Sequence, residues 1–264
     1  MTGAGSALEV RGLSKSFLTD GGMVDALAGV DLRAASGERV ALIGPSGCGK
    51  STLFNIVAGL DQPTAGEVRI GGEVLAERLG ASAYMPQRDA LLPWRRVLDN
   101  VTLALELAGR PRREARAVAT PLLDRFGLGR FAGAWPWQLS GGMRHRAAFL
   151  RTVIAQPPLV LLDEPFGALD GITRADLQQW VSDVWSGMDS TVLLVTHDIT
   201  EAVFLADRVV VLTPRPGRVA TVLDVDLPRP RRLAVQETAD FVDLERRLRH
   251  ELRAAMPAAG PAPA

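Results

Sequence analysis

Short apolar runs recur along the chain, separated by stretches in which apolar residues recur at helical spacing. Runs such as 159–162 and 209–212 have the length of strands buried in a sheet. Strands alternating with helical patterns are typical of an α/β fold with a largely parallel sheet. The strands expected from the pattern are 38–43, 66–70, 81–84, 159–162, 191–196 and 208–212.

Helical patterns fill much of the remaining chain. A helix is expected over 50–58, because Gly59 is well placed to end it. From 97 to 155 the composition shifts to Leu, Ala and Arg with helical spacing, which predicts a helical subdomain, bounded at about 88–156, inserted into the sheet domain. Further helices are expected at 172–185 and 241–252, where apolar residues form one stripe.

Composition narrows the class of protein. The chain has 264 residues, which is enough for one large domain, and its Lys plus Arg equal its Asp plus Glu at 30 each. A neutral balance gives no reason to expect nucleic acid as the main partner. No signal peptide or membrane-spanning run is visible, and the single cysteine, Cys48, excludes an internal disulfide. We expect a cytoplasmic protein with one domain over 7–253, a flexible start at 1–6 and a disordered Ala/Pro-rich tail at 254–264.

A glycine-rich segment between an expected strand and an expected helix fits the phosphate-binding pattern G-x-x-x-x-G-K-S/T. Its glycines let backbone N–H groups curl around phosphates, and the helix N-terminus adds partial positive charge. Lys50 is expected to neutralise phosphate oxygens, and the Ser51 hydroxyl to ligate Mg²⁺. Cys48 is interpreted as a small filler rather than a redox thiol. The candidate nucleotide-binding residues here are Gly44, Pro45, Ser46, Gly47, Cys48, Gly49, Lys50, Ser51 and Thr52.

Two further expected strands end in polar residues. Asp163 and Glu164 follow the apolar run 159–162, and His197 follows 191–196. Asp163 can face Mg²⁺, while Glu164 points differently and is free to orient or deprotonate a water that attacks the terminal phosphate. Ligands of open α/β sheets lie beyond the carboxyl ends of the strands, so His197 is expected to contact the same phosphate.

The segment Leu139-Ser140-Gly141-Gly142-Met143-Arg144 resembles the signature loop of ATP-binding cassette (ABC) proteins, and the resemblance extends over about residues 8–219. It implies a P-loop ATPase of ABC type, with a parallel sheet core, an antiparallel β subdomain and the inserted helical subdomain. It also implies that Phe17 stacks on adenine, although Phe17 is equally interpretable as a core residue. Gln87 matches the glutamine that touches Mg²⁺ and the attacking water, and Asp170 lies in the loop that crosses the dimer interface.

The resemblance implies that Ser140, Gly141 and Gly142 contact the ATP held by an opposite subunit. Bare N–H groups at a helix start can approach a phosphate closely. An active unit is therefore expected to be a head-to-tail dimer, homodimeric or with a homologous cassette, that encloses two ATP molecules. His145 stands where the family usually has Gln, and we expect it to tune the site rather than inactivate it.

Single-cassette architecture without membrane helices resembles the ATPase subunit of an importer. Segments 87–101, 166–174 and 203–208 resemble the group that imports nitrate, sulfonates, taurine and pyrimidine precursors of thiamine. That resemblance implies membrane permease subunits as partners, a periplasmic or lipid-anchored solute-binding protein acting indirectly, and a location at the cytoplasmic face of the membrane. Trp94 either receives a permease coupling helix or belongs to the core. The alternatives are a cassette acting on nucleic acid or ribosomes, and a nucleotide-dependent clamp without turnover.

Overall fold

The computed structural model describes residues 6–75, 77–167, 171–185 and 188–256. Expectations for Asp170 and for the terminal residues 1–5 and 257–264 lie outside this part of the chain. The first strand, β1, already begins at Ser6, and the last helix, α8 (Ala239–Ala254), ends within the expected tail.

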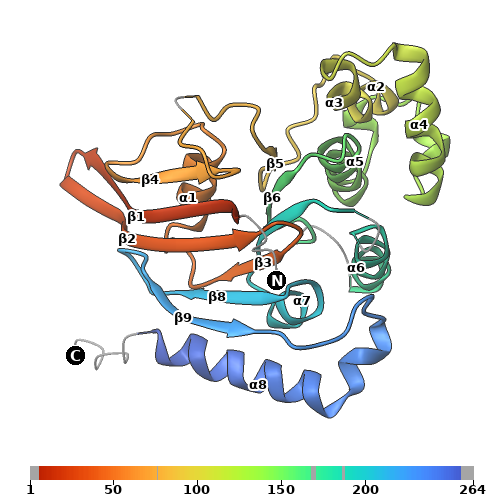
Figure 1. Cartoon of the computed structure of the whole chain (residues 1–264). Coiled ribbons are helices and arrows are strands. Elements are labelled where there is room, and N and C mark those ends of the chain that lie inside the picture. The colour runs from red at the N-terminus through yellow and green to blue at the C-terminus, as the bar shows by residue number, and fades with distance from the viewer. Residues whose placement is uncertain (1–5, 76, 168–170, 186–187, 257–264) are drawn as a thin grey trace, which may run out of the picture.

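Two sheets make up the core of the fold (Figure 1). An antiparallel sheet has the order β2-β1-β4, from β1 (Ser6–Thr19), β2 (Gly22–Ala35) and β4 (Ala65–Ile70). The second sheet has the order β5-β6-β7-β3-β8-β9, and all its pairings are parallel except that of β8 with β9. Its strands are β3 (Arg39–Ile43), β5 (Ala83–Met85), β6 (Leu159–Asp163), β7 (Thr191–Val195), β8 (Arg208–Leu212) and β9 (Val219–Asp224).

The central strands are buried on both faces, which explains their continuous apolar sequences. Along β3, Val40 and Leu42 pack toward the antiparallel sheet, while Ala41 and Ile43 pack into the cluster on the other side. The strands β6 and β7 alternate in the same way. Helix α1 (Lys50–Val57) packs into the hydrophobic cluster that contains Val40 and Leu42, between the two sheets.

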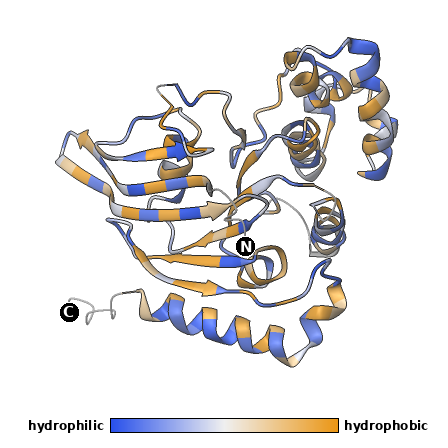
Figure 2. Cartoon of the chain, viewed as in Figure 1, coloured by the Kyte–Doolittle hydropathy of each residue, from blue (hydrophilic) through white to orange (hydrophobic). Residues whose placement is uncertain are grey.

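The other face of the parallel sheet is covered by helices. The helices described after α1 are α2 (Val97–Val101), α3 (Leu103–Leu107), α4 (Arg112–Arg125), α5 (Gly141–Val153), α6 (Gly171–Trp185), α7 (Ile199–Leu205) and α8, with 3-10 turns at Gly129–Phe131, Pro136–Gln138 and Leu233–Glu237. Helices α2, α3 and α4 form a group beyond the β5 edge of the sheet (Figure 1). Helix α8 lies beneath β8 and β9 and turns its polar side outward (Figure 2).

A buried arginine fixes the connection between β9 and α8. Arg231 is 3% exposed and donates to the backbone carbonyls of Phe204 and Ala206 at 3.2 and 2.5 Å. Phe204 lies in the last turn of α7 and Ala206 is its C-cap residue, so neither carbonyl has a partner within the helix itself. The same guanidinium also reaches the carbonyl of Leu227 at 3.3 Å. Arg231 thus caps α7, the helix that follows the His197 loop.

The α/β prediction with a largely parallel sheet is confirmed. The pattern missed β9 and both strands of the hairpin β1–β2. In β9 only Leu223 is buried, so its apolar signal is weak. The β1–β2 pairing is interrupted by several register shifts, which break the period of two that identifies a strand from sequence. The expected strand 81–84 is displaced to Ala83–Met85.

Candidate functional site

The loop between β3 and α1 is held in place by close backbone contacts. Gly49, with φ of 103°, is the N-cap of α1, and a Cβ there would lie 2.8 Å from the carbonyl oxygen of Ala26. At Gly44 a Cβ would lie 3.1 Å from the carbonyl oxygen of Leu212. Neither position has room for a side chain, and Gly49 also has a backbone conformation that other residues avoid. The two glycines let the loop approach β2 and β8.

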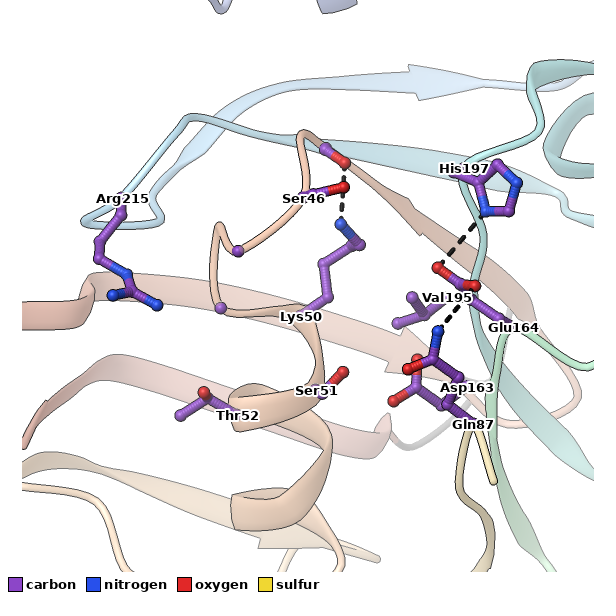
Figure 3. A pocket seen from close by; sticks show the side chains of 13 residues that line it. Ser46, Lys50, Ser51, Thr52, Gln87, Asp163, Glu164, Val195, His197 and Arg215 are labelled. Atoms are coloured by element: carbon purple, nitrogen blue, oxygen red, sulfur yellow. Dashed lines mark hydrogen bonds and ion pairs between the residues drawn. The ribbon is translucent and has the colours of Figure 1, made fainter. Parts of the chain in front are cut away.

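Lys50 is buried at the first position of α1, and its side chain folds over the loop (Figure 3). Its Nζ donates to the carbonyl oxygens of Gly44 at 2.8 Å and Pro45 at 3.0 Å, and lies 3.6 Å from Cys48 Sγ. Among the residues described, no carboxylate forms an ion pair with this ammonium. Its charge therefore remains available to an anion in the loop.

Asp163 ends β6 at the side of the pocket nearest Ser51. It is 3% exposed, and burial raises the pKa of its carboxyl group. The hydrogen bond from the Ser51 hydroxyl and the charge of Lys50 lower that pKa, while the neighbouring Glu164 adds to the increase. A buried carboxylate of this kind favours a cation beside it.

The oxygen atoms beside Asp163 are of the kinds that bind Mg²⁺. Carboxylate, hydroxyl and amide oxygens are available from Asp163, Ser51 and Gln87 around one cavity, and Mg²⁺ prefers a few such oxygens together with substrate phosphates and water. In the described part of the chain, no group of three His, Cys, Asp or Glu side chains could hold a metal by itself. The phosphates of a bound nucleotide would have to complete the coordination.

Glu164 is held between two polar side chains that follow different strands, β5 and β7 (Figure 3). Its Oε2 accepts a hydrogen bond from Gln87 Nε2 at 3.1 Å, and its Oε1 lies 3.4 Å from His197 Nδ1. Its backbone has a φ of 52° and its N–H donates to the carbonyl of Val195 at 2.9 Å. This left-handed turn directs the carboxylate away from Asp163. The arrangement can orient a water and accept its proton.

These residues surround one cavity of about 530 Å³, a size suited to a nucleotide. Its lining comprises Gly44, Ser46, Gly47, Gly49, Lys50, Ser51, Thr52, Gln87, Asp163, Glu164, Val195, His197 and Arg215. Sequence reasoning missed Val195 and Arg215. Nothing in the local pattern around Arg215 places it against a loop some 170 residues earlier.

Other candidate residues lie elsewhere. Phe17 is 39% exposed on β1, so it is not a core residue, but it does not line the cavity. Ser140 caps α5 by accepting from the N–H of Met143 at 3.3 Å, and Gly141 begins that helix. The segment 140–142 does not line the cavity. One described chain thus brings the loop, Asp163, Glu164, Gln87 and His197 together without the signature segment.

His145 lies on α5 and is 4% exposed. Burial lowers the pKa of its imidazole, an effect opposed by hydrogen bonding to the backbone of Pro165 and Glu164 and by the charge of Asp89. Its Nε2 has no hydrogen-bond partner among the residues described. The departure from the usual Gln therefore places a neutral ring against the backbone that carries Glu164.

Fold and cavity together define a P-loop nucleotide-binding protein. Residues 27–167 match the family model described as "ABC transporter". The aliphatic sulfonates import ATP-binding protein SsuB of Pseudomonas putida is 47% identical over 227 residues, covering 86% of this chain and 80% of the relative. An uncharacterised ABC transporter ATP-binding protein of Methanocaldococcus jannaschii is 46% identical over 224 residues, covering 85% of this chain and 84% of that protein.

A comparison with solved structures points to the same class of protein. A dimeric, post-hydrolysis ATP-binding cassette bound to ADP and phosphate superposes with a TM-score of 0.75 at 31% identity, covering 84% of this chain and 100% of that one. The chain belongs to the ATP-binding subunits of ABC transporters. Members of this family bind and hydrolyse ATP, and so does this chain. The predicted family and the predicted ATPase activity are both confirmed. No helix in the described ranges is long and apolar enough to span a membrane.

Proposed function

We propose that this chain is the ATPase subunit of an importer for a small organic anion of the sulfonate type. The support is the 47% identity to the sulfonate-import protein of Pseudomonas putida, together with a complete set of candidate hydrolytic residues around one cavity. Permease subunits and, indirectly, a periplasmic or lipid-anchored solute-binding protein are its partners. It works at the cytoplasmic face of the membrane.

In the proposed reaction, Glu164 orients a water for attack on the γ-phosphorus and takes its proton, so that ADP and inorganic phosphate form. Gln87 and His197 hold the two carboxylate oxygens of Glu164. Lys50 offsets charge on the phosphates. Ser51 and Asp163 would hold Mg²⁺, which would supply further neutralisation of the phosphate charge.

The active unit is proposed to be a head-to-tail dimer, homodimeric or with a homologous cassette. The observation that supports this is the separation of the segment 140–142 from the cavity in a single chain. N–H groups at the start of a helix can bind phosphate, and this segment does not line the cavity of its own chain. A second subunit, with Asp170 in its proposed interface role, would complete each nucleotide pocket.

The permease is proposed to dock beside Trp94, which is 70% exposed. That exposure removes the alternative that Trp94 is a core residue. The nearby Arg95 is held by Glu106 at 3.2 Å, which fixes the segment that carries the tryptophan. A large exposed aromatic side chain on a fixed segment is typical of an interface.

One variant tests dimer and mechanism together. Glu164→Gln keeps an amide that Gln87 and His197 can contact, but it cannot accept a proton from water. We expect at least a hundredfold loss of hydrolysis and an ATP-dependent dimer in size-exclusion chromatography. Glu237→Gln, an exposed carboxylate on the 3-10 turn before α8, is the matched control. Turnover near wild type in Glu164→Gln would remove the assignment of the base.

Membrane recruitment tests the importer itself. The subunit is expected to copurify with the permease encoded beside it, and Trp94→Ala is expected to reduce that association while leaving ATPase activity of the isolated subunit unchanged. Transport of a radiolabelled sulfonate by the assembled complex would support the solute class. Stimulation of the ATPase by DNA or ribosomes, without membrane recruitment, would instead identify a cassette that acts on nucleic acid.

A further inference from the structure

The turn between β8 and β9 is seated directly on the phosphate loop. Gly217 in this turn donates to the carbonyl of Ala26 at 2.9 Å and accepts from the N–H of Ala28 at 3.0 Å. A Cβ on Gly217 would lie 2.1 Å from the carbonyl oxygen of Cys48. Only a glycine permits this approach, so the turn and the loop form one packed unit.

Internal bonds make the turn itself rigid. Thr213 N–H donates to the carbonyl of Arg218 at 2.9 Å, and Thr213 Oγ1 donates to the carbonyl of Pro216 at 3.2 Å. Pro214 and Pro216 flank Arg215, and each proline ring restricts its own backbone φ. The backbone of Arg215 is therefore held in place before any ligand arrives, which reduces the entropy lost on binding.

Arg215 brings a positive charge to the nucleotide cavity. It lines the cavity together with Lys50, and these are the two Lys or Arg residues of the lining. Within the described residues, Arg215 has no hydrogen-bond or ion-pair partner. In Figure 3 it lies at the end of the pocket opposite Glu164 and His197, with the phosphate loop between them.

This position determines which part of a nucleotide it can reach. Glu164 and His197 mark the end where the terminal phosphate is cleaved, and Lys50 lies between that end and Arg215 (Figure 3). A nucleotide extended along the loop would place its ribose-proximal phosphate at the Arg215 end. A guanidinium can contact two phosphate oxygens at once through its fork of N–H donors.

We propose that Arg215 is a further nucleotide-binding residue that contacts the α-phosphate of ATP. The proposal rests on the cavity being the ATP site of the cassette. Since the α-phosphate is distant from the bond that breaks, the contact is equally strong before and during hydrolysis. Arg215 therefore contributes to affinity for ATP and ADP alike, and not to the rate of the chemical step.

The test compares Arg215→Ala, Arg215→Lys and Arg218→Ala in the purified full chain. Arg218 lies in the same turn and does not line the cavity, so it is the matched control. We expect Arg215→Ala to raise the Kd for both ATP and ADP about tenfold, as for loss of a charged hydrogen bond. KM should rise by a similar factor with kcat within about twofold. Arg215→Lys, which keeps the charge without the fork, should lie between these values.

Two results would overturn the proposal: an Arg215→Ala Kd within about twofold of wild type for both nucleotides, or a loss of ATP affinity without a loss of ADP affinity. The second result would mean that Arg215 contacts the γ-phosphate. A melting temperature without nucleotide that matches wild type shows that the turn is intact. Lys50→Ala is run in parallel, because unchanged binding in that variant would place the nucleotide elsewhere and would count against the site itself.

Discussion

Glu201 provides a test of the electrostatics behind the His197 loop. It lies in the first turn of α7, is 3% exposed, and its pKa is raised to about 8. Burial is the main cause and the charge of Asp198 adds to it, while Thr196, Arg174 and Gln178 act in the opposite direction. At neutral pH this carboxyl group is therefore mostly protonated in the folded protein.

The raised pKa of Glu201 in the folded protein determines how the free energy of unfolding changes with pH. In the unfolded chain Glu201 ionises near its usual pKa of about 4.3, so between that pH and about 8 the folded state binds more protons than the unfolded state. The contribution of Glu201 to stability is fully present below the lower pKa and falls as pH rises, by about 1.4 kcal/mol per pH unit. Above the folded pKa the loss is complete.

Glu201→Gln removes this proton linkage and keeps the shape of the side chain. We expect the variant to match wild type near pH 4 and to be more stable at higher pH, by a margin on the order of 3 kcal/mol at pH 7. The measurement is urea unfolding at pH 5, 6, 7, 8 and 9, with Glu237→Gln as the exposed control. Parallel stability curves for wild type and Glu201→Gln from pH 5 to 8 would refute the reasoning, as would a variant that is less stable at pH 8.

Two further substitutions probe contacts that hold the site. Arg231→Met removes the donors that cap α7 and leaves its last carbonyls buried without partners. We therefore expect a loss of about 3 kcal/mol in the free energy of unfolding, measured with denaturant. A loss below about 1 kcal/mol would contradict this role. Gly49→Ala places a methyl group 2.6 Å from Leu27 Cδ2 in a left-handed conformation. It should abolish detectable ATP binding in titration calorimetry, and binding at wild-type affinity would show that the loop adapts to a side chain.

Local sequence determined the parts of the site that follow strands. The apolar run of β6 and the residues after it placed Asp163 and Glu164 at one sheet edge, because parallel strands bring their carboxyl ends together. The glycine pattern was recognisable in the same way, because it lies between a predicted strand, β3, and a predicted helix, α1. Most strands of the central sheet were therefore predictable from the sequence, and the assignment to the ABC type came from the family resemblance. The order of the strands was not predicted.

Contacts between distant segments were not accessible in this way. Arg215 reaches the cavity because Gly217 packs on Cys48, and neither residue signals the other in the sequence. The hairpin β1–β2 escaped detection because its register shifts break the alternation of apolar and polar positions. Trp94 was left open between surface and core, since a single aromatic residue gives no period from which to assign a face.

Helix α5 connects three parts of the site that are separate in sequence. Its first turn carries Gly141 and Gly142. One turn later, Arg144 Nε bonds Asp89, two residues beyond Gln87, at 2.9 Å, and Arg151 donates to the carbonyl of Asp89 at 3.0 Å.

The buried ring of His145, on the same helix, contacts the backbone that carries Glu164. A displacement of the Gln87 segment would have to break charge-assisted bonds or carry α5 with it. If α5 moves with it, segment 140–142 moves together with Gln87 and Glu164, the residues proposed to hold the attacking water. In the proposed dimer, a permease that shifts the segment beside Trp94 would therefore act through one rigid helix on two places: the cavity of its own chain and the segment 140–142 that faces the partner's ATP. A neutral His145 preserves that link without adding charge next to Glu164.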